Sequence, residues 1–291
     1  MQDQTKAYLY AAATVLFWST VATAFKLSLR HLSADALVFY SSLVSVAVLL
    51  CITLATGRLR QLRDWNAGDL RRSLGLGFLN PFLYYLVLFR AYALLPAQEA
   101  LTLNFTWPVV LALFSIVLLR QPISVRALLA MAISFAGVAL IATRGNPLGL
   151  NLANPLGVAL ALGSTLIWAL YWIYGVKDGR DPVTRLLANF GFGCVLSGGY
   201  LWFSGSLETP GLPGLAGALY IGTFEMGIAF VAWLRALRLS RTTAQVAQLI
   251  YLTPFLSLLL ISFVVGEPIY PSTVAGLALI VGGIALQRRA G

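Results

Sequence analysis

FTWPVVLALFSIVLLRQP, residues 105–122, is repeated with variations as YLTPFLSLLLISFVVGEP at residues 251–268. In both copies an aromatic residue comes first, a proline follows three positions later, and a long apolar run ends at an x-Pro pair. Pro108 thereby aligns with Pro254, and Gln121-Pro122 aligns with Glu267-Pro268. The chain therefore carries one helical pattern twice, which indicates an internal repeat.

The composition indicates which environment surrounds this repeat. The 291 residues are 59% hydrophobic and only 10% charged, with a mean hydropathy of +0.84. Soluble proteins carry about 25% charged residues, so this chain has too few charges for a polar surface, and we expect a lipid bilayer around it. The net charge of +10 would suggest nucleic acid on a soluble surface. Cytoplasmic loops of membrane proteins collect Lys and Arg, and we expect no nucleic-acid partner.

Ten segments are long and apolar enough to cross a bilayer as helices, which takes about 20 residues each. They are residues 7–29, 34–56, 73–94, 98–119, 124–143, 155–176, 183–204, 213–236, 243–265 and 270–287. The apolar runs are continuous and lack the short alternation of a transmembrane β-barrel. The sequence therefore predicts an all-α integral membrane protein with ten transmembrane helices.

The basic residues indicate how these spans are oriented. With the N-terminus inside, the cytoplasmic side receives 16 of the 20 Lys and Arg residues. The outside receives Arg30, Arg90 and Arg144, and Lys26 falls near the outer end of the first span. Because cytoplasmic loops are enriched in Lys and Arg, we expect both termini in the cytoplasm.

The repeat extends beyond the two quoted stretches. Leu16-Phe17-Trp18-Ser19 aligns with Leu166-Ile167-Trp168-Ala169, and Gly137 aligns with Gly283. The chain thus divides into two halves, residues 1–145 and 150–291, with five predicted spans each. Five is odd, so the second half must cross the membrane in the opposite sense. Such inverted repeats are typical of secondary transporters, whose substrate site lies between the repeats near the bilayer midplane. A duplication kept only for packing is the alternative.

The final helices of the two halves share a further pattern. Residues 130–144 read AMAISFAGVALIATR and residues 276–289 read GLALIVGGIALQRR, and each Gly-rich helix follows a Gln-Pro or Glu-Pro turn. Two five-helix halves that end in this way resemble the EamA-like family of the drug/metabolite transporter superfamily, over essentially the whole chain. The family often has Glu before this proline. Glu267 matches that pattern, whereas the first half has Gln121.

Within that superfamily, the density of intramembrane Trp and Tyr is most similar to that of the YddG-type exporters of aromatic and other hydrophobic amino acids. The resemblance implies a bacterial cytoplasmic (inner) membrane exporter. It also implies a central cavity that is lined by spans from both halves and binds a small-molecule substrate. We expect a monomer or weak dimer.

Polar side chains at bilayer depth are costly and usually line a pathway. Glu225 lies near the middle of the predicted span 213–236, and the repeat alignment places it opposite Asn80 in span 73–94. Both residues are therefore expected at similar depth, where they could face a cavity and contact an ammonium group or a proton. Alternatively, Glu225 stays protonated and hydrogen-bonds to a neighbouring helix.

Three prolines fall inside predicted spans. Pro81, Pro108 and Pro254 each remove a backbone hydrogen bond and free a carbonyl group. Such kinks can act as hinges of a gate, or they can be static.

Aromatic and polar side chains at mid-span depth complete the candidate site. Rings could stack on an aromatic or large aliphatic substrate, with their NH and OH groups for orientation. The candidate lining residues are Trp18, Asn80, Tyr84, Tyr85, Trp107, Ser164, Trp168, Tyr171, Glu225, Gln245, Gln248 and Tyr251. Interfacial belts also enrich Trp and Tyr, but Trp18 and Trp168 lie too deep for a belt. Trp107 could equally serve packing.

The leading prediction is a secondary transporter that exports aromatic and other hydrophobic amino acids by alternating access. A polyspecific drug/metabolite exporter of the same fold, proton-coupled through Glu225, is the alternative. An intramembrane enzyme would need clustered His, Asp or Cys, whereas this sequence has one histidine and scattered acids. We expect no catalytic residues, metal or cofactor.

Overall fold

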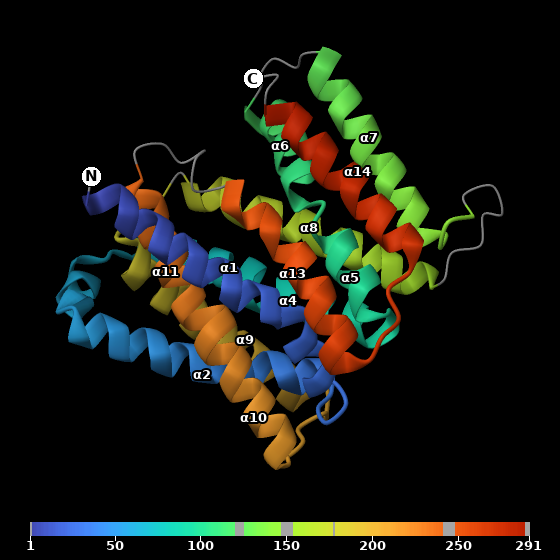
Figure 1. The fold of residues 1–291 in the computed structure, drawn as a ribbon. Coiled ribbons are helices and arrows are strands. Elements are labelled where there is room, and N and C mark those ends of the chain that lie inside the picture. Colours follow the sequence, from blue (N-terminus) through green and yellow to red (C-terminus); the bar gives the residue numbers. More distant parts are fainter. Residues whose placement is uncertain (1, 120–124, 147–153, 177, 241–247, 289–291) are drawn as a thin grey trace.

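The computed structural model describes residues 2–119, 125–146, 154–176, 178–240 and 248–288, and every regular element within them is a helix (Figure 1). The α-helices are α1 (Gln2–Ser28), α2 (Ala34–Ala55), α3 (Ala67–Gly77), α4 (Tyr84–Leu94), α5 (Ala97–Asn104), α6 (Trp107–Leu119), α7 (Val125–Ala142), α8 (Pro155–Val176), α9 (Pro182–Phe203), α10 (Leu212–Tyr220), α11 (Phe230–Leu239), α13 (Thr253–Leu260) and α14 (Pro271–Arg288). The 3₁₀ segments are η1 (Arg58–Asp64) and η5 (Gln248–Leu252), and the π-helical segments are η2 (Phe78–Leu83), η4 (Ile221–Ala229) and η6 (Ile261–Val265).

Within these described residues, six helical stretches are long and apolar enough to cross a membrane. They are Asp3–Ser28, Ala34–Ala55, Ala67–Leu94, Pro155–Gly175, Pro182–Phe203 and Leu212–Leu239. Shorter apolar helices cover Leu129–Ala142, Leu249–Val265 and Pro271–Leu286. The chain is therefore an all-helical, multi-span membrane protein, as the composition predicted.

Two predicted spans are not continuous helices. Residues 98–119 divide into α5 and α6. In the predicted span 243–265, the described part begins with the 3₁₀ segment η5, and α13 follows from Thr253. Pro108 is the second residue of α6, and Pro254 is the second residue of α13. Proline is tolerated there because the first-turn N–H groups have no intrahelical acceptor anyway.

The stretch predicted as a loop between residues 58 and 72 is largely helical. It contains η1 and the first turns of α3, which starts at Ala67 rather than at residue 73. The Asn66 side chain accepts hydrogen bonds from the backbone N–H groups of Gly68 and Asp69, and the Asp69 carboxylate accepts one from the Asn66 N–H. This capping box stabilises the earlier start.

The third and eighth spans are both interrupted near their middle. In η2, Asn80 has non-helical angles (φ −149°, ψ 119°) before a cis bond to Pro81, so the helix breaks where the sequence predicted. In η4, a π-helical stretch surrounds Glu225, which the sequence did not predict. Short π segments are frequent at functional sites because they displace side chains from the regular helical register.

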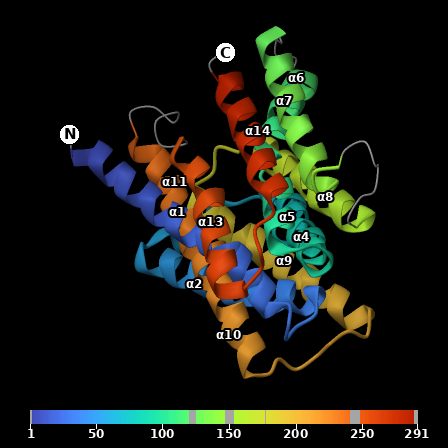
Figure 2. The same cartoon turned by 45° about the vertical axis from the view of Figure 1, so that its right-hand side comes forward.

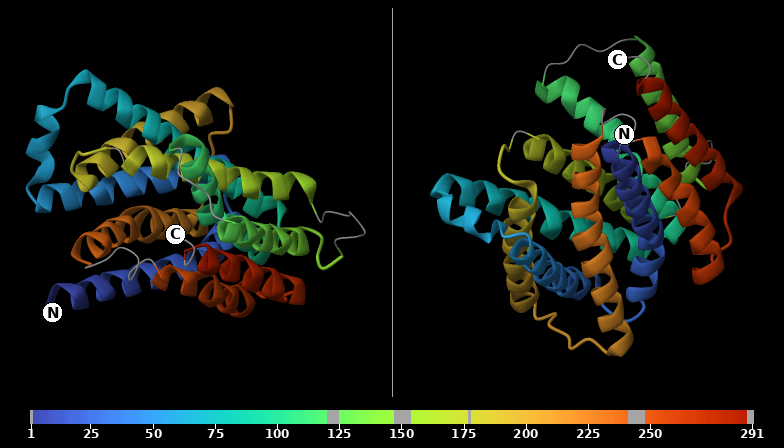
Figure 3. Two further views of the ribbon diagram at one scale, coloured as in Figure 1. Left: turned by 90° about the horizontal axis from the view of Figure 1, so that it is seen from above. Right: turned by 60° about the vertical axis from the view of Figure 1, so that its left-hand side comes forward.

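The helices of the two halves pack against one another in pairs. α7 and α14 lie side by side along their length in every view (Figures 1, 2 and 3). Gly137 of α7 lies against the α14 backbone at Gly276, and Gly283 of α14 lies against α7 at Ser134. α1 packs on α11, α4 on α8, and α2 on α9. Small residues allow this close approach of membrane helices.

Candidate functional site

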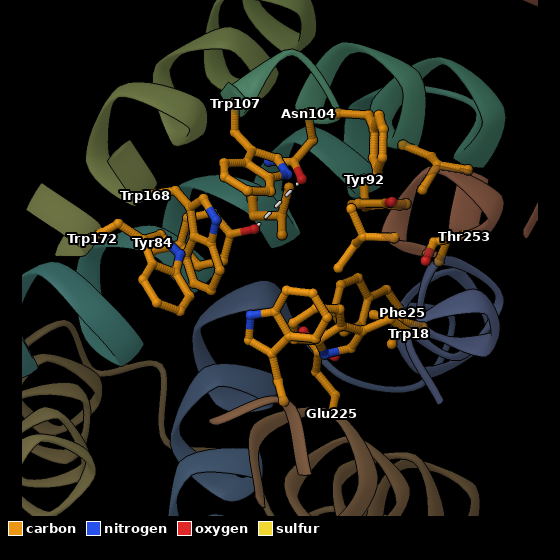
Figure 4. A pocket seen from close by; sticks show the side chains of 17 residues that line it. Trp18, Phe25, Tyr84, Tyr92, Asn104, Trp107, Trp168, Trp172, Glu225 and Thr253 are labelled. Atoms are coloured by element: carbon orange, nitrogen blue, oxygen red, sulfur yellow. Dashed lines mark hydrogen bonds between the residues drawn. The ribbon is translucent and has the colours of Figure 1, made fainter. Parts of the chain in front are cut away.

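A cavity lies at the centre of the bundle, between α1, α4, α5, α6, α8, η4, α11, η5 and α13 (Figure 4). Its volume, counted as the space that the centre of a water molecule can occupy, is about 110 Å³. Five of the residues expected at a substrate site contribute to its wall, which are Trp18, Tyr84, Trp107, Trp168 and Glu225. The cavity is therefore lined mainly by aromatic side chains that surround one carboxylate.

Glu225 is held in place from one side only. Its Oε1 accepts a hydrogen bond from the Tyr85 hydroxyl at 3.0 Å, whereas its buried Oε2 has no hydrogen-bond partner within the described structure. The residue is 9% exposed and lies at the cavity wall beside Trp18 and Phe25 (Figure 4). A carboxylate oxygen without a partner in an apolar cavity favours a ligand that brings a proton or a positive charge.

One aromatic wall is built around Trp168 of α8. Its indole stacks on Tyr84 of α4, with ring centroids 4.6 Å apart and planes at 30°, and on Tyr171 at 5.9 Å. Trp172 meets it edge-to-face at 5.8 Å. The Trp168, Tyr84 and Trp172 rings form one group in Figure 4. Because these rings lock one another in position, the wall is preorganised for a flat ligand.

The opposite wall belongs to α1 and α11. Trp18 lies 5.7 Å from Trp233 and 6.1 Å from Phe230, measured between ring centroids. The sequence interpretation did not single out Trp233, although its repeat mate, Leu88, also lines the cavity.

The polar groups in the cavity are mostly neutral donors. The Asn104 amide donates to the Ser164 hydroxyl at 2.8 Å, and its oxygen receives a long 3.5 Å bond from the Tyr84 hydroxyl (dashed in Figure 4). The buried indole N–H groups of Trp18 and Trp172 have no acceptor among the residues described. These donors are available to an anionic or carbonyl group of a ligand.

Other expected site residues lie behind this first layer. Tyr85 is fully buried, and the Tyr251 ring packs edge-to-face on Phe105 at 6.4 Å. Asn80 does not line the cavity. It lies next to the Tyr171 hydroxyl, although its amide atoms complete no hydrogen bond of good geometry within the described structure.

Two predicted residues on the ninth span cannot be placed at the cavity. Gln245 lies outside the described residues, and only the backbone of Gln248 is described, within η5.

The prolines occupy distinct positions. Pro81 packs against Gly193 of α9, whereas Pro108 and Pro254 start α6 and α13. Their action as hinges stays a prediction.

A polar network closes the end of the bundle where α5 begins. Gln98 is fully buried, and its side chain holds the turn before α14, because it donates to the Pro268 carbonyl and accepts from the Tyr270 N–H. Glu99 pairs with Arg144 of the turn after α7 at 2.7 Å. We call Gln98 and Glu99, with these partners, the α5 clasp.

Two further contacts reinforce the α5 clasp. The Glu267 carboxylate accepts from the Ala97 N–H at 2.8 Å, and Lys26 donates to the carbonyls of Tyr92 and Leu95 at 2.9 and 2.6 Å. The network joins α1, α4, α5 and the chain before α14 at this end of the bundle.

A crystal structure of a protein that is 24% identical to this chain has the same fold. The two structures superpose with a TM-score of 0.69, and the match covers 98% of both chains.

Among curated proteins, an uncharacterized transporter YvbV of Bacillus subtilis is 28% identical over 97% of this chain and 92% of its own. Uncharacterized protein PA1977 of Pseudomonas aeruginosa is 31% identical over 70% of this chain and 69% of its own. The aromatic amino acid exporter YddG of Ancylobacter novellus is 28% identical over 73% of each chain.

The model of the EamA-like transporter family matches residues 5–143 and again residues 155–288. These two matches cover nearly all of the chain, and they confirm the resemblance seen in its Gly-rich final helices. The chain belongs to the EamA-like transporter family and is a multi-span membrane transporter.

Proposed function

We propose that the protein exports aromatic and other hydrophobic amino acids across the bacterial cytoplasmic membrane, with the central cavity as the binding site. The observation that carries this proposal is the aromatic cavity around the unpartnered Oε2 of Glu225. An aromatic side chain would lie against the wall built around Trp168 and Tyr84, and the ammonium group would reach Glu225. Ring stacking and a charge-assisted hydrogen bond would then act on two ends of one substrate.

The substrate carboxylate would be bound by neutral donors. The described residues that line the cavity include no Lys or Arg, so the Asn104 amide and the indole N–H groups of Trp18 and Trp172 are the available partners among them. The relative from Ancylobacter novellus, which is named an aromatic amino acid exporter, gives independent support.

Transport would proceed by alternating access between two inverted five-helix halves, residues 1–145 and 150–291, with ten spans in total. The helix contacts support this architecture. When each span is replaced by the corresponding span of the other half, a contact between two helices becomes another contact that the structure also contains. The α1–α11 contact maps onto α8–α4, and α1–α13 maps onto α8–α6. The two separate family matches fit the same division. The distribution of Lys and Arg supports cytoplasmic termini.

A polyspecific exporter of organic cations, proton-coupled through Glu225, is the second candidate. The absence of Lys and Arg from the described lining residues favours it, because a zwitterion would gain from a cationic partner and an organic cation would not. In such an exporter the unpartnered Glu225 oxygen would bind a proton and the cation in turn.

Reconstituted vesicles distinguish the two candidates. Proteoliposomes loaded with radiolabelled phenylalanine should release it faster than protein-free vesicles, and excess unlabelled tryptophan should slow the release. Equal flux with and without a pH gradient would exclude obligatory proton coupling. Release of a lipophilic cation such as ethidium, without release of any aromatic amino acid, would overturn the amino-acid proposal in favour of the second candidate.

A further inference from the structure

A second hollow lies at the surface, apart from the central cavity. It runs between α3 and the end of α8. Its volume, counted in the same way as that of the central cavity, is about 400 Å³. Its lining residues are Arg72, Gly75, Leu76, Leu79, Tyr174 and Asp178; we call this hollow the α3 groove. The floor is apolar, and Gly75 leaves it open, because a Cβ atom there would meet nothing within 4 Å.

The residues around the α3 groove are of the kinds expected at the headgroup level of a bilayer. It lies on the stretch Ala67–Leu94, which is long and apolar enough to span the membrane, and exposed Leu74 and Phe78 flank it on the same helix. Trp65, a residue type enriched at the membrane interface, lies just before α3. From Arg72 to Leu79 the helix rises about 10 Å, so the groove runs from the polar interface into the hydrocarbon layer.

The polar end of the α3 groove is positively charged. Arg72 is exposed and forms no ion pair with another described residue, and the same holds for Arg60, Arg63 and Arg71 close to it in the chain. The patch therefore presents cationic groups that no described carboxylate neutralises.

Two acids at and near the groove rim are already paired. The Asp178 carboxylate at the groove rim is bonded by Arg180, and Arg185 adds a hydrogen bond to the Asp178 carbonyl at 2.9 Å. Asp181 pairs with Arg58 at 2.7 Å. Arg72 is therefore the unpaired charge at the groove.

We propose that the α3 groove binds one anionic phospholipid, with its phosphate on Arg72 and an acyl chain along Gly75, Leu79 and Tyr174. The chemistry on both ends of the groove supports this occupant. A soluble anion would need no apolar floor, and a zwitterionic lipid would gain little from an unpaired arginine. Juxtamembrane arginines attract anionic lipids through the same electrostatics.

Titration of the detergent-solubilised full chain with phosphatidylglycerol tests the proposal, with lipid adducts counted by native mass spectrometry and Tm followed by intrinsic fluorescence. We expect one tight phosphatidylglycerol that phosphatidylcholine does not replace. Arg72→Gln should weaken its binding about fivefold, because each arginine near an anionic surface contributes about that factor. Arg72→Lys should retain most of the affinity.

Gly75→Leu tests the acyl half of the groove, because the added side chain fills open space and leaves the headgroup arginine in place. It should abolish the tight adduct. Gly282→Leu on α14 is its matched control, since Gly282 is also exposed and a Cβ there also meets nothing within 4 Å. Arg60→Gln is the control for diffuse electrostatics and should leave the tight adduct in place.

Three outcomes of the lipid titrations would overturn the proposal. They are equal binding of phosphatidylcholine, equal loss in Arg60→Gln and Arg72→Gln, and an adduct that survives Gly75→Leu. Displacement of the lipid by labelled phenylalanine would also overturn it, by assigning the groove to the transported solute. Size-exclusion profiles and Tm without added lipid confirm that each variant is folded.

Discussion

Replacing Glu225 by glutamine changes one charge in the central cavity and little else. The Tyr85 hydroxyl, 3.0 Å from Oε1, would still donate to the amide oxygen of the variant, and the side-chain volume is unchanged. The buried oxygen that has no partner within the described structure, Oε2, would be replaced by an NH₂ group. We therefore expect a folded protein that has lost its acceptor for a substrate ammonium group.

The size of the effect follows from that single contact. A hydrogen bond to a charged group contributes about 1.5–3 kcal/mol, which corresponds to a change in Kd of about 10- to 150-fold. Glu225→Gln should weaken phenylalanine binding by this factor. 3-Phenylpropionate, which has the ring and the carboxylate but no ammonium group, should lose no affinity in the variant, because it makes no charge-assisted bond to Glu225 and is relieved of repulsion by its carboxylate.

Scintillation proximity binding of labelled phenylalanine to purified protein, with competition by 3-phenylpropionate, measures both values. Glu208→Gln is the matched control, because Glu208 bonds to the Ser33 N–H far from the cavity, and the same chemical change there should leave both affinities unchanged. An equal loss for both ligands would mean that the variant damaged the cavity. An unchanged affinity for phenylalanine would refute the assignment of Glu225 to the ammonium group.

Three further predictions address other parts of the molecule. Trp168→Ala should remove the stacked wall and reduce phenylalanine binding by at least tenfold. The variant loses both the apolar area that the ring buries and the further contribution of about 0.5–1.5 kcal/mol that a ring contact makes. Trp202→Ala, which removes a 70% exposed indole, should leave phenylalanine binding unchanged. Gln98→Leu should speed hydrogen exchange at the Tyr270 amide by about fivefold or more in mass spectrometry, because that N–H loses its acceptor; unchanged exchange would show that the α5 clasp does not hold the turn. Burial raises the pKa of the Asp178 carboxyl, but the hydrogen bonds and charge of its arginine partner outweigh burial and hold the pKa below its usual value. Its stabilisation is therefore present above the ordinary pKa and is lost as the pH falls through the lowered one, so the Tm advantage over Asp178→Asn should vanish only below about pH 4; an advantage that is independent of pH would contradict the ion pair.

The membrane-spanning elements were largely predictable because hydropathy dominates their formation. The expected spans 34–56 and 183–204 differ from α2 and α9 by one residue at their ends. The break at Asn80-Pro81 was also predictable, since proline cannot continue a helix. The π-helical stretch around Glu225 contains no proline, and its formation depends on packing. Gly222 within it lies directly against the backbone of Ser41 on α2, a contact that only the tertiary structure supplies.

The sequence indicates which residues fall near the middle of a span, but it does not indicate the direction in which their side chains face. Trp168 and Glu225 attract notice because large polar aromatics and acids are unusual at mid-span, and both line the cavity. The repeat alignment gave Asn80 and Glu225 equal depth. It could not specify rotation about the helix axis, and the helix break at Asn80 changes that rotation, so Asn80 lies beside Tyr171 instead.

Under the proposed alternating access between two inverted halves, the α5 clasp would make the two mouths of the transporter non-equivalent. The register that aligns Phe105 with Tyr251, continued toward the N-terminus, aligns Gln98 and Glu99 with Ala244 and Gln245. An alanine side chain cannot form the two hydrogen bonds to the backbone that Gln98 forms. A transporter built from inverted copies would rest equally in either orientation if both mouths closed with the same strength. Divergence at two neighbouring positions is enough to break that degeneracy. The side of the membrane to which the empty transporter opens at rest would then be determined by residues in the first turn of one short helix, α5.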